Sequence, residues 1–294
     1  MTMHADEFPI SNDLVAAMLA EQFPQWSGRA LHRVTSAGTD NAMVRIGDEL
    51  VARLPRIAGA VPGIQKEQRL LPLLAKHLPI PIPAVVAIGQ PGDFFPWPWT
   101  VLTWMDGESL DRHPVVDEAA LAIDLAEVLR SLHAVKPLPG LRLREGRGQP
   151  LRDRDEQTRD TIRSLPHDLD ADRALAIWDA ALAAPFDALP RVVHGDVMPG
   201  NLLIQNGRLA GMIDFGSLAL GDRAVDLMPA WNLFSPSARQ VFRDATHATD
   251  QMWAKGRGWA LSQAVIALPY YRKTNPVLAG IAQQTIAAVL ADSA

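Results

Sequence analysis

An aspartate, an asparagine and a second aspartate stand in this sequence at spacings that suit phosphoryl transfer. The letters HGDVMPGN occupy residues 194–201, and IDFG occupies residues 213–216. Asn201 therefore follows Asp196 by five positions, and Asp214 follows it by eighteen. In this chemistry one acid accepts a proton from an attacking hydroxyl, while side-chain oxygens hold a metal ion on the phosphates of a nucleotide. We predict Asp196 as the catalytic base and Asn201 and Asp214 as ligands of Mg²⁺.

A predicted β-hairpin joins the two runs. Asn206-Gly207 lies between apolar runs, and an Asn-Gly pair in that setting favours a two-residue hairpin turn. Pairing the residues on either side of the turn places Asn201 opposite Met212, with Asp214 diagonally one step further on. Such diagonal neighbours are about 7–8 Å apart at Cα, so the two side chains can converge on one hard cation.

Each of these residues also has a simpler explanation when it is taken alone. Asp196 could cap a turn, Asn201 could be a loop residue and Asp214 could close a strand, because Asn and Asp are common in turns. The hairpin ties the three together and favours a shared chemical role. His194 is predicted to support the loop by hydrogen bonding, since Asp196 already supplies the base.

The two runs resemble the catalytic and metal loops of protein kinases, with His-Gly-Asp where those kinases have His-Arg-Asp. This variant is similar to the aminoglycoside phosphotransferase family and related small-molecule kinases, over about residues 38–226. The resemblance implies an α+β, protein-kinase-like fold of two lobes, with ATP or GTP as phosphoryl donor. It also implies a hydroxylated small molecule as acceptor. An aminoglycoside is the first expectation, and macrolide, choline, homoserine or fructosamine-type acceptors are the alternatives.

A phosphate-anchoring cation and an acid on the following helix should complete such a site. The position that matches the kinase lysine holds Arg53, a departure that leaves a weakened enzyme or a non-catalytic binding protein as alternatives. Glu67 is spaced by 4, 3 and 4 positions from Leu71, Leu74 and Leu78, which places it on an apolar helix face. An unpaired buried carboxylate is costly, so we predict an Arg53–Glu67 ion pair; a half-exposed Glu67 is the alternative.

Two further segments resemble the nucleotide-binding parts of the family. The turn at residues 36–41 resembles the loop that covers the phosphates, although a simple hairpin turn would also explain it. Residues 99–105 resemble the hinge, whose backbone would bind the base, although Trp104 and Met105 could be ordinary packing residues. The side chains do not decide between adenine and guanine. The predicted nucleotide-binding residues are Gly38, Thr39, Asn41, Arg53, Thr103, Trp104 and Met105.

The acceptor is not specified by the sequence. The charge-rich segment 142–170 and the C-terminal helices should form its pocket, and the short stretch between Gly216 and Asp222 disfavours a protein acceptor. Acids that could contact ammonium groups are Asp153, Asp155, Glu156 and Asp160, but such a charge run more often covers a solvated helix face. Aromatic residues that could stack on an acceptor are Trp231, Trp253, Trp259, Tyr270 and Tyr271, although core packing is favoured for most. Asp226 resembles the structural aspartate of the family, which implies that it stabilises the catalytic loop.

The elements that must position these residues follow from the periodicity of the apolar residues. A small antiparallel sheet with one main helix is predicted first, with strands near 31–36, 42–46, 50–54, 85–88 and 99–104 and helices near 13–23 and 64–78. Asn12 or Asp13 should cap the first of these helices. Pro72 should kink or restart the second helix. A helix near 117–134 with Asp117 as its N-cap, a helix near 171–184 and a last helix opened by Asn275-Pro276 follow. We predict a nucleotide-binding lobe with the hinge at 1–105 and a catalytic and acceptor-binding lobe at 106–294.

Composition excludes several classes of function. The 294 residues include no cysteine, which excludes disulfides, thiolate metal sites and a cysteine nucleophile. A net charge of −5 argues against a nucleic-acid-binding protein. No apolar run reaches the roughly 18 residues of a membrane span, and the polar, acidic N-terminus does not resemble a secretory signal. We expect a cytoplasmic protein with no membrane, nucleic-acid or obligate protein partner.

Overall fold

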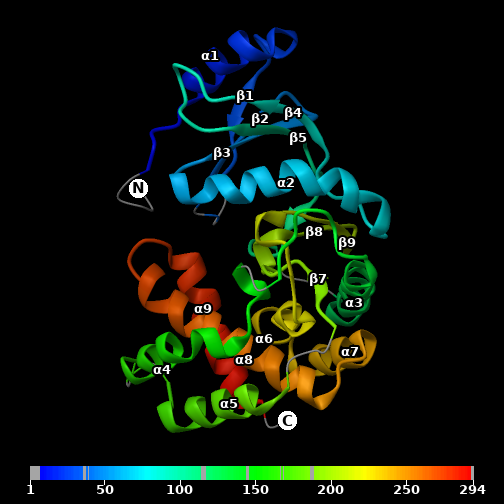
Figure 1. Ribbon diagram of the computed structural model, residues 1–294, viewed down its shortest axis with the longest axis vertical. Helices are drawn as coiled ribbons and strands as arrows, with labels where there is room; N and C mark the ends of the chain where they lie inside the picture. Colours follow the sequence, from blue (N-terminus) through cyan, green and yellow to red (C-terminus); the bar gives the residue numbers. More distant parts are fainter. Residues whose placement is uncertain are drawn as a thin grey trace.

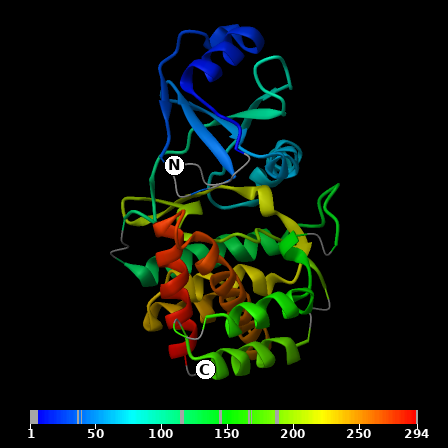
Figure 2. The same cartoon turned by 90° about the vertical axis from the view of Figure 1, so that its left-hand side faces the viewer.

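The computed structural model describes residues 7–35, 38, 40–113, 117–143, 146–165, 167, 169–185 and 189–292. Within these ranges an antiparallel sheet with helices forms the N-terminal part, and helices dominate the remainder (Figure 1). Figure 2 shows the same division from the side, with the sheet above and the longer helices below. The α+β architecture predicted from the sequence, an antiparallel sheet with a helix followed by a mainly helical part, is confirmed.

The described N-terminal sheet has five strands, in the order β1-β2-β3-β5-β4, and each neighbouring pair is antiparallel. Its strands are β1 (Leu31–Arg33), β2 (Asn41–Ile46), β3 (Leu50–Pro55), β4 (Val85–Gly89) and β5 (Trp99–Thr103). Helix α1 (Asn12–Gln22) precedes them. Its N-cap is Ser11, whose Oγ accepts a hydrogen bond from the Leu14 N–H, and not Asn12 or Asp13 as predicted, because only Ser11 has the extended backbone of a cap.

Helix α2 (Val61–Leu74) lies across the sheet on the side that faces the helical part (Figure 1). It continues through Pro72 to Leu74 and then tightens into a 3-10 turn over Ala75–His77, so the predicted restart at Pro72 does not occur. Its apolar residues Leu70, Leu71 and Leu74 are buried in the same core cluster as Val51 and Leu102 of the sheet. The sheet is thereby fixed to the helical part through α2.

The remainder of the chain is built from helices around short strands. The helices are α3 (Glu118–Ala134), α4 (Asp155–Arg163), α5 (Ala171–Ala183), α6 (Pro229–Asn232), α7 (Pro236–Thr246), α8 (Asp250–Tyr271) and α9 (Pro276–Ala291). The strands are β6 (Glu108–Ser109), β7 (Arg191–Val193), β8 (Leu202–Gln205), β9 (Arg208–Met212) and β10 (Ala219–Gly221). Asp117 caps α3 and Asn275 caps α9, as predicted.

The β8–β9 hairpin differs in register from the sequence prediction. Gln205 pairs with Arg208 across the turn as predicted, but Leu202 pairs with Met212 after a one-residue shift. Ala210 is the extra residue of β9, because the residues on either side of it pair with consecutive residues of β8. An inserted residue of this kind is a β-bulge, which a turn sequence does not specify.

The bulge changes the partner of the predicted metal ligand. The Asn201 carbonyl accepts a hydrogen bond from the Ile213 N–H at 3.0 Å, so Asn201 stands opposite Ile213 and not opposite Met212. Asp214 is the next residue after Ile213. The bulge therefore brings Asp214 one position closer to Asn201 along the hairpin than the regular register would.

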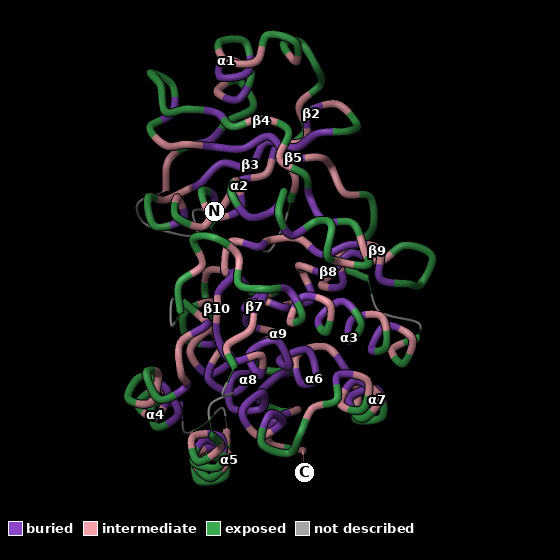
Figure 3. The backbone as a smooth tube through the Cα atoms, turned by 45° about the vertical axis from the view of Figure 1, so that its right-hand side comes forward, coloured by how far each residue is buried: buried purple, intermediate pink, exposed green. Residues whose placement is uncertain are grey.

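Two groups of buried side chains hold the fold together. One lies between α1 and the sheet and includes Phe95 and Trp99. The other extends from α2 into the helical part, where α8 contributes the most buried residues of the described helices (Figure 3). Within the described residues no helix combines the length and the apolarity needed to cross a membrane.

Candidate active site

A cleft of about 720 Å³ lies between the sheet and the helical part. Its walls come from β2, β3, α2, the segment after β5, the loop after β7, the end of β9, and helices α8 and α9. The predicted residues that line it are Gly38, Asn41, Arg53, Glu67, Thr103, Trp104, Met105, Asp196, Asn201 and Asp214. Thr39 lies outside the described residues. Among these predicted residues, Gly38 and Asp214 are 176 positions apart in the chain and still line the same cleft.

The loop after β7 is held from beneath by Asp226. This fully buried carboxylate accepts hydrogen bonds from the backbone N–H groups of His194 at 3.0 Å and Gly195 at 2.8 Å. Nε2 of His133, on α3, lies 2.9 Å from the same carboxylate. Asp226 therefore stabilises the loop, as predicted, because its oxygens satisfy N–H groups that would otherwise be buried without partners.

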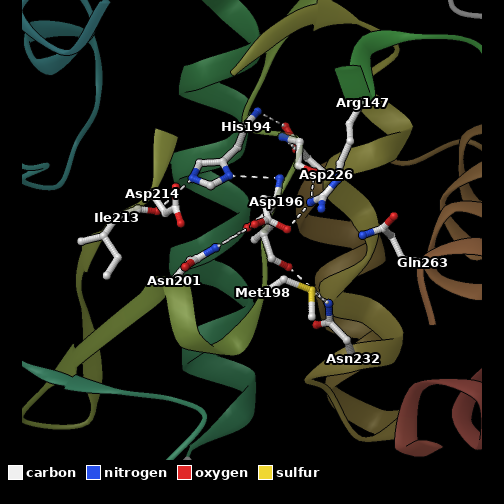
Figure 4. Close-up of polar contacts among 12 residues, drawn as sticks. Arg147, His194, Asp196, Met198, Asn201, Ile213, Asp214, Asp226, Asn232 and Gln263 are labelled. Carbon is white, nitrogen blue, oxygen red and sulfur yellow. Dashed lines mark hydrogen bonds and ion pairs between the residues drawn. The ribbon is translucent and has the colours of Figure 1, made fainter. Parts of the chain in front are cut away.

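His194 supports the same loop from the opposite side. Its Nδ1 accepts a hydrogen bond from the Asp196 N–H at 3.2 Å, which places the ring proton on Nε2. Nε2 then donates to the Ile213 carbonyl at 3.2 Å (Figure 4). Both ring nitrogens are engaged with the backbone, so His194 joins the loop to the end of β9, as predicted.

The carboxylate of Asp196 is oriented by two side chains. Nη1 of Arg147 donates to its Oδ1 and, at 2.8 Å, to the Gly195 carbonyl. Nδ2 of Asn201 donates to the Asp196 backbone carbonyl at 2.9 Å and to Oδ2 at 3.3 Å (Figure 4). The carboxylate is only part-buried and lines the cleft, so a hydroxyl can reach it.

Arg147 is a residue that the sequence reasoning missed. It stands in the triplet Gly146-Arg147-Gly148, which packs against β10. A Cβ at Gly148 would lie 2.8 Å from the Leu220 carbonyl oxygen, and one at Gly221 would lie 2.4 Å from the Gly148 Cα. The two backbones approach so closely that neither position accepts a side chain. The signal in the sequence was the pair of glycines around one arginine within a charge-rich stretch.

Replacing Gly148 by alanine should lower the free energy of unfolding by about 1–3 kcal/mol, because an added methyl in a tight backbone contact forces the chain apart. Urea denaturation followed by circular dichroism measures this. Gly280→Ala is the matched control: a Cβ there meets nothing within 4 Å, and alanine in a helix should stabilise by about 0.5–1 kcal/mol. Equal stability of Gly148→Ala and the wild-type protein would contradict the tight contact.

Arg53 lies between two carboxylates in the upper wall of the cleft. Its Nε is 3.0 Å from Oε2 of Glu67, and its Nη2 donates to Oδ1 of Asp214 at 2.6 Å. Oε1 of Glu67 accepts from the Phe215 N–H at 2.8 Å. The Nε–H forms no hydrogen bond within the described residues, so the Glu67 contact is an ion pair without hydrogen-bond alignment. The predicted Arg53–Glu67 pair is confirmed, and Glu67, 3% exposed, is not a boundary residue.

The three charges set one another's ionisation. Burial raises the pKa of Glu67 to about 7, against the opposing effect of Arg53. Burial also disfavours the charge on Asp214, but the Arg53 guanidinium outweighs it and holds the pKa of Asp214 below its usual range. Burial alone would lower the pKa of Arg53, but the combined effect of Asp214 and Glu67 is larger, so the pKa of Arg53 is raised. The Arg53 guanidinium therefore stays positively charged, and Asp214 loses its proton more readily than Glu67.

Asn201 and Asp214 fit the chemistry of a magnesium site. Because Nδ2 of Asn201 points at the Asp196 carbonyl, the amide presents its Oδ1 on the other side. Asp214 adds a carboxylate from a left-handed backbone position, φ 63°, that turns the chain out of β9. Among the described residues no group of three or more His, Cys, Asp or Glu could hold a metal by itself. Phosphate and water oxygens would have to complete the coordination.

The hinge residues are bound to the sheet through part of their backbone. The Thr103 N–H donates to the Ala84 carbonyl at 3.0 Å, and the Trp104 N–H donates to the Glu49 carbonyl at 2.7 Å. The Trp104 ring lies under the Arg45 guanidinium, 4.5 Å from its centroid. The N–H of Met105 donates to no backbone group in the described part of the chain, so it takes no part in the hydrogen bonding of the sheet.

In the described part of the segment 142–170, the four acids considered for the acceptor, Asp153, Asp155, Glu156 and Asp160, do not line the cleft. Asp155 pairs with Arg159 at 2.6 Å and accepts from the Trp178 indole, and Asp160 lies 3.4 Å from Arg163. These acids cover a helix face, as the alternative explanation expected, and Arg147 is the described residue of the segment that lines the cleft. Of the aromatic residues considered, Trp231, Trp253 and Trp259 are buried in the core and Tyr271 lines the cleft.

Known proteins resemble this chain in sequence and fold. The model of the phosphotransferase enzyme family, APH, matches residues 32–259. An aminoglycoside 3'-phosphotransferase of Escherichia coli is 38% identical over 68 residues, which are 22% of this chain and 25% of that protein. One of Salmonella typhimurium is 41% identical over 59 residues, 19% of this chain and 22% of that protein. The matches to these curated relatives thus span a quarter or less of their length.

Solved structures share the fold over nearly the whole chain. The GDP and kanamycin complex of APH(2")-IIia has a TM-score of 0.75 at 21% identity and covers 95% of this chain and 99% of that chain. A structure named macrolide 2'-phosphotransferase type I has a TM-score of 0.65 at 20% identity, with 94% and 98% covered. The family model matches more than two hundred consecutive residues, including the whole loop after β7. This chain therefore belongs to the phosphotransferase enzyme family.

Proposed function

We propose that this protein transfers the γ-phosphate of ATP or GTP to a hydroxyl of a small molecule, with Mg²⁺ as cofactor. The observation that supports this most strongly is the meeting of Asp196, Asn201 and Asp214 in one cleft, opposite the cation Arg53. A kinase-like protein that only binds its ligand would not need the base and both oxygen ligands. The same cleft supplies a place for the donor and a place for the acceptor.

The proposed reaction follows from the positions of the side chains. The acceptor oxygen attacks the γ-phosphorus, the bond from that phosphorus to the β–γ bridging oxygen breaks, and the nucleoside diphosphate leaves. Asp196, oriented by Arg147 and Asn201, accepts the hydroxyl proton on its carboxylate. Arg53 binds the donor phosphates and is held in place by Glu67. When bound, Mg²⁺ neutralises charge on the phosphates, and Asn201 and Asp214 would hold it.

The division of labour is proposed to follow the fold. Residues 1–105 would bind the nucleotide and include the hinge, where the Met105 N–H contacts the base. Gly38, Thr39 and Asn41 would cover its phosphates, and Thr103 and Trp104 would contribute to the base site. Residues 106–294 would carry the catalytic loop and the acceptor. An aminoglycoside is the acceptor that the sequence favours, and the names of the relatives support aminoglycosides or macrolides.

The proposal is tested by measuring transfer of labelled γ-phosphate from ATP and from GTP. Acceptors are kanamycin, gentamicin, streptomycin and a macrolide, each with Mg²⁺ and with a chelator. We expect transfer that requires Mg²⁺, and Asp214→Asn should reduce it at least a hundredfold, because the amide brings no charge to the metal. Asp48→Asn, whose side chain is fully exposed, should leave it unchanged. No transfer and no nucleotide-induced rise in Tm would favour the non-catalytic alternative.

A further inference from the structure

The cleft continues beyond Asp196 onto a wall formed by α8 and α9, which we call the acceptor wall. Most of its side chains are aliphatic. They are Ala260, Ala264, Ala267, Leu278, Ile281 and Ala282. Small and branched aliphatic groups in two neighbouring helices present an apolar surface to whatever lies next to the catalytic loop. Burial of apolar surface on this wall would supply binding energy for an acceptor with a matching apolar face.

The polar residues of the acceptor wall are Gln263, Tyr271 and Thr285, none of which is an acid or a base of the Asp, Glu, Lys or Arg type. Oε1 of Gln263 accepts from Nη2 of Arg154 at 3.1 Å, and Oγ1 of Thr285 donates to the Ile281 carbonyl at 2.7 Å. The first bond joins α8 to Arg154 and the second lies within α9, so both of these oxygen atoms are already engaged. A polycationic acceptor would therefore find few oxygen atoms on this wall to replace the water around its ammonium groups.

One polar atom beside the catalytic loop has no partner. Nδ2 of Asn232 donates to the Val197 carbonyl at 3.2 Å and lies 3.3 Å from the sulfur of Met198 (Figure 4). Its Oδ1 is buried and accepts no hydrogen bond within the described residues, and Asn232 lines the cleft. An orphaned buried acceptor of this kind requires an explanation. A single donor group of a bound acceptor, such as a second hydroxyl, would supply the missing bond.

The charges near the acceptor wall disfavour the binding of a polycation. Arg147 places a cation directly on Asp196, and Arg154 lies behind Gln263. The described acids that line the cleft lie instead on the sheet, α2, the segment after β5 and the catalytic segments: Asp40, Glu67, Glu108, Asp111, Asp196 and Asp214. Of the acids after β5, Glu108 lies 3.3 Å from His113, and Asp111 accepts from the Ser109 hydroxyl.

We infer that the acceptor is a largely apolar alcohol with at most one positive charge, bound against the acceptor wall with one further donor group on Asn232. This inference rests on the proposed function and replaces the aminoglycoside as the expected acceptor. On the acceptor wall a molecule with several ammonium groups would have to lose water without gaining carboxylates, because the described acids of the cleft lie on its other walls, and it would lie next to the cation of Arg147. An alcohol with an extended apolar face has neither several ammonium groups to desolvate nor several positive charges to bring close to Arg147.

The test compares acceptors and two variants of one wall residue. Binding is measured by calorimetry, and kcat/KM by transfer, for kanamycin and for a panel of apolar alcohols that includes a macrolide with a single amino group. In the wild-type protein we expect the binding constant and the kcat/KM of an apolar alcohol each to exceed those of kanamycin at least tenfold. Ile281→Glu should lower that preference at least tenfold, because it places a carboxylate on the wall. Ile281→Gln, of equal size and no charge, should change it far less.

Two controls separate this inference from the proposed function. Acceptor-independent, Mg²⁺-dependent nucleotide hydrolysis and the KM for nucleotide are measured in both variants and the wild-type protein, and acceptor preferences are compared at equal saturation with nucleotide. If hydrolysis occurs but kanamycin binds more tightly than every apolar alcohol, the inference is overturned while the function stands. Failure of every apolar alcohol to bind overturns it as well. If nucleotide is neither bound nor hydrolysed, the proposed function fails, and calorimetry with the acceptors still decides what the wall binds.

Discussion

Asp196→Asn is expected to lower kcat for phosphoryl transfer by about 10²–10⁴-fold, the usual contribution of a positioned general base. The amide keeps the size of the side chain and an oxygen for the Arg147 guanidinium, but it cannot accept the hydroxyl proton. The residues proposed to bind the nucleotide lie mostly on the sheet side of the cleft, and the acceptor wall lies on α8 and α9, so nucleotide affinity should change little. Initial rates with saturating acceptor and calorimetric titration with nucleotide measure the two quantities.

Two observations keep this prediction specific to the base. Asp93→Asn, at an exposed position outside the cleft, should have wild-type kinetics. The Tm of Asp196→Asn should remain close to that of the wild-type protein, because Asp226 and His194 still hold the loop. A variant that retains more than a tenth of the wild-type kcat would show that Asp196 is not the base.

Arg53→Ala is expected to damage both the fold and the nucleotide site. Removing one partner of a buried ion pair typically costs about 3–5 kcal/mol, because the remaining charge has no compensation. Here Glu67 and Asp214 would both lose their cation. The donor phosphates would lose their anchor as well, so the KM for nucleotide should rise at least tenfold. Urea denaturation gives the first effect, and initial rates at varied nucleotide concentration give the second.

Arg53→Lys separates charge from geometry. Lysine keeps the positive charge but cannot reach two carboxylates with a planar fork, so its effects should lie between those of the wild-type protein and Arg53→Ala. A nucleotide KM that is unchanged in Arg53→Ala, measured on folded protein, would exclude Arg53 from the donor site. A loss of stability without a change in KM would assign Arg53 to the fold alone.

Local signals in the sequence specified most of the elements and much of the cleft. Asp117 and Asn275 were predictable as caps because a cap is defined by its own side chain and the next three residues. The Arg53–Glu67 pair was predictable because an acid on an apolar helix face needs a partner. Both arguments depend on short stretches of chain and a general rule about burial.

The features that were missed depend on contacts between distant segments. Arg147 reaches Asp196 from 49 positions away, and only the approach of Gly148 to Gly221 places it there. The third partner in the charge cluster, Asp214, reaches Arg53 across 161 positions. The periodicity of apolar residues predicts local helices and strands, and it contains no information about contacts between segments so far apart in the sequence. The bulge at Ala210 had one local sign, the glycine that follows it, since glycine inside a strand often marks a bulge.

The bulge at Ala210 also bears on which changes this protein can tolerate. The turn at Asn206-Gly207 decides how the tips of β8 and β9 pair, and the bulge then resets the pairing before Asn201 and Ile213 meet. The tip is exposed, whereas the base of the hairpin is held by the catalytic loop. Insertions, deletions and sequence drift at the tip should therefore accumulate in related proteins without displacing Asp214, because the bulge isolates the two ends of the hairpin from each other.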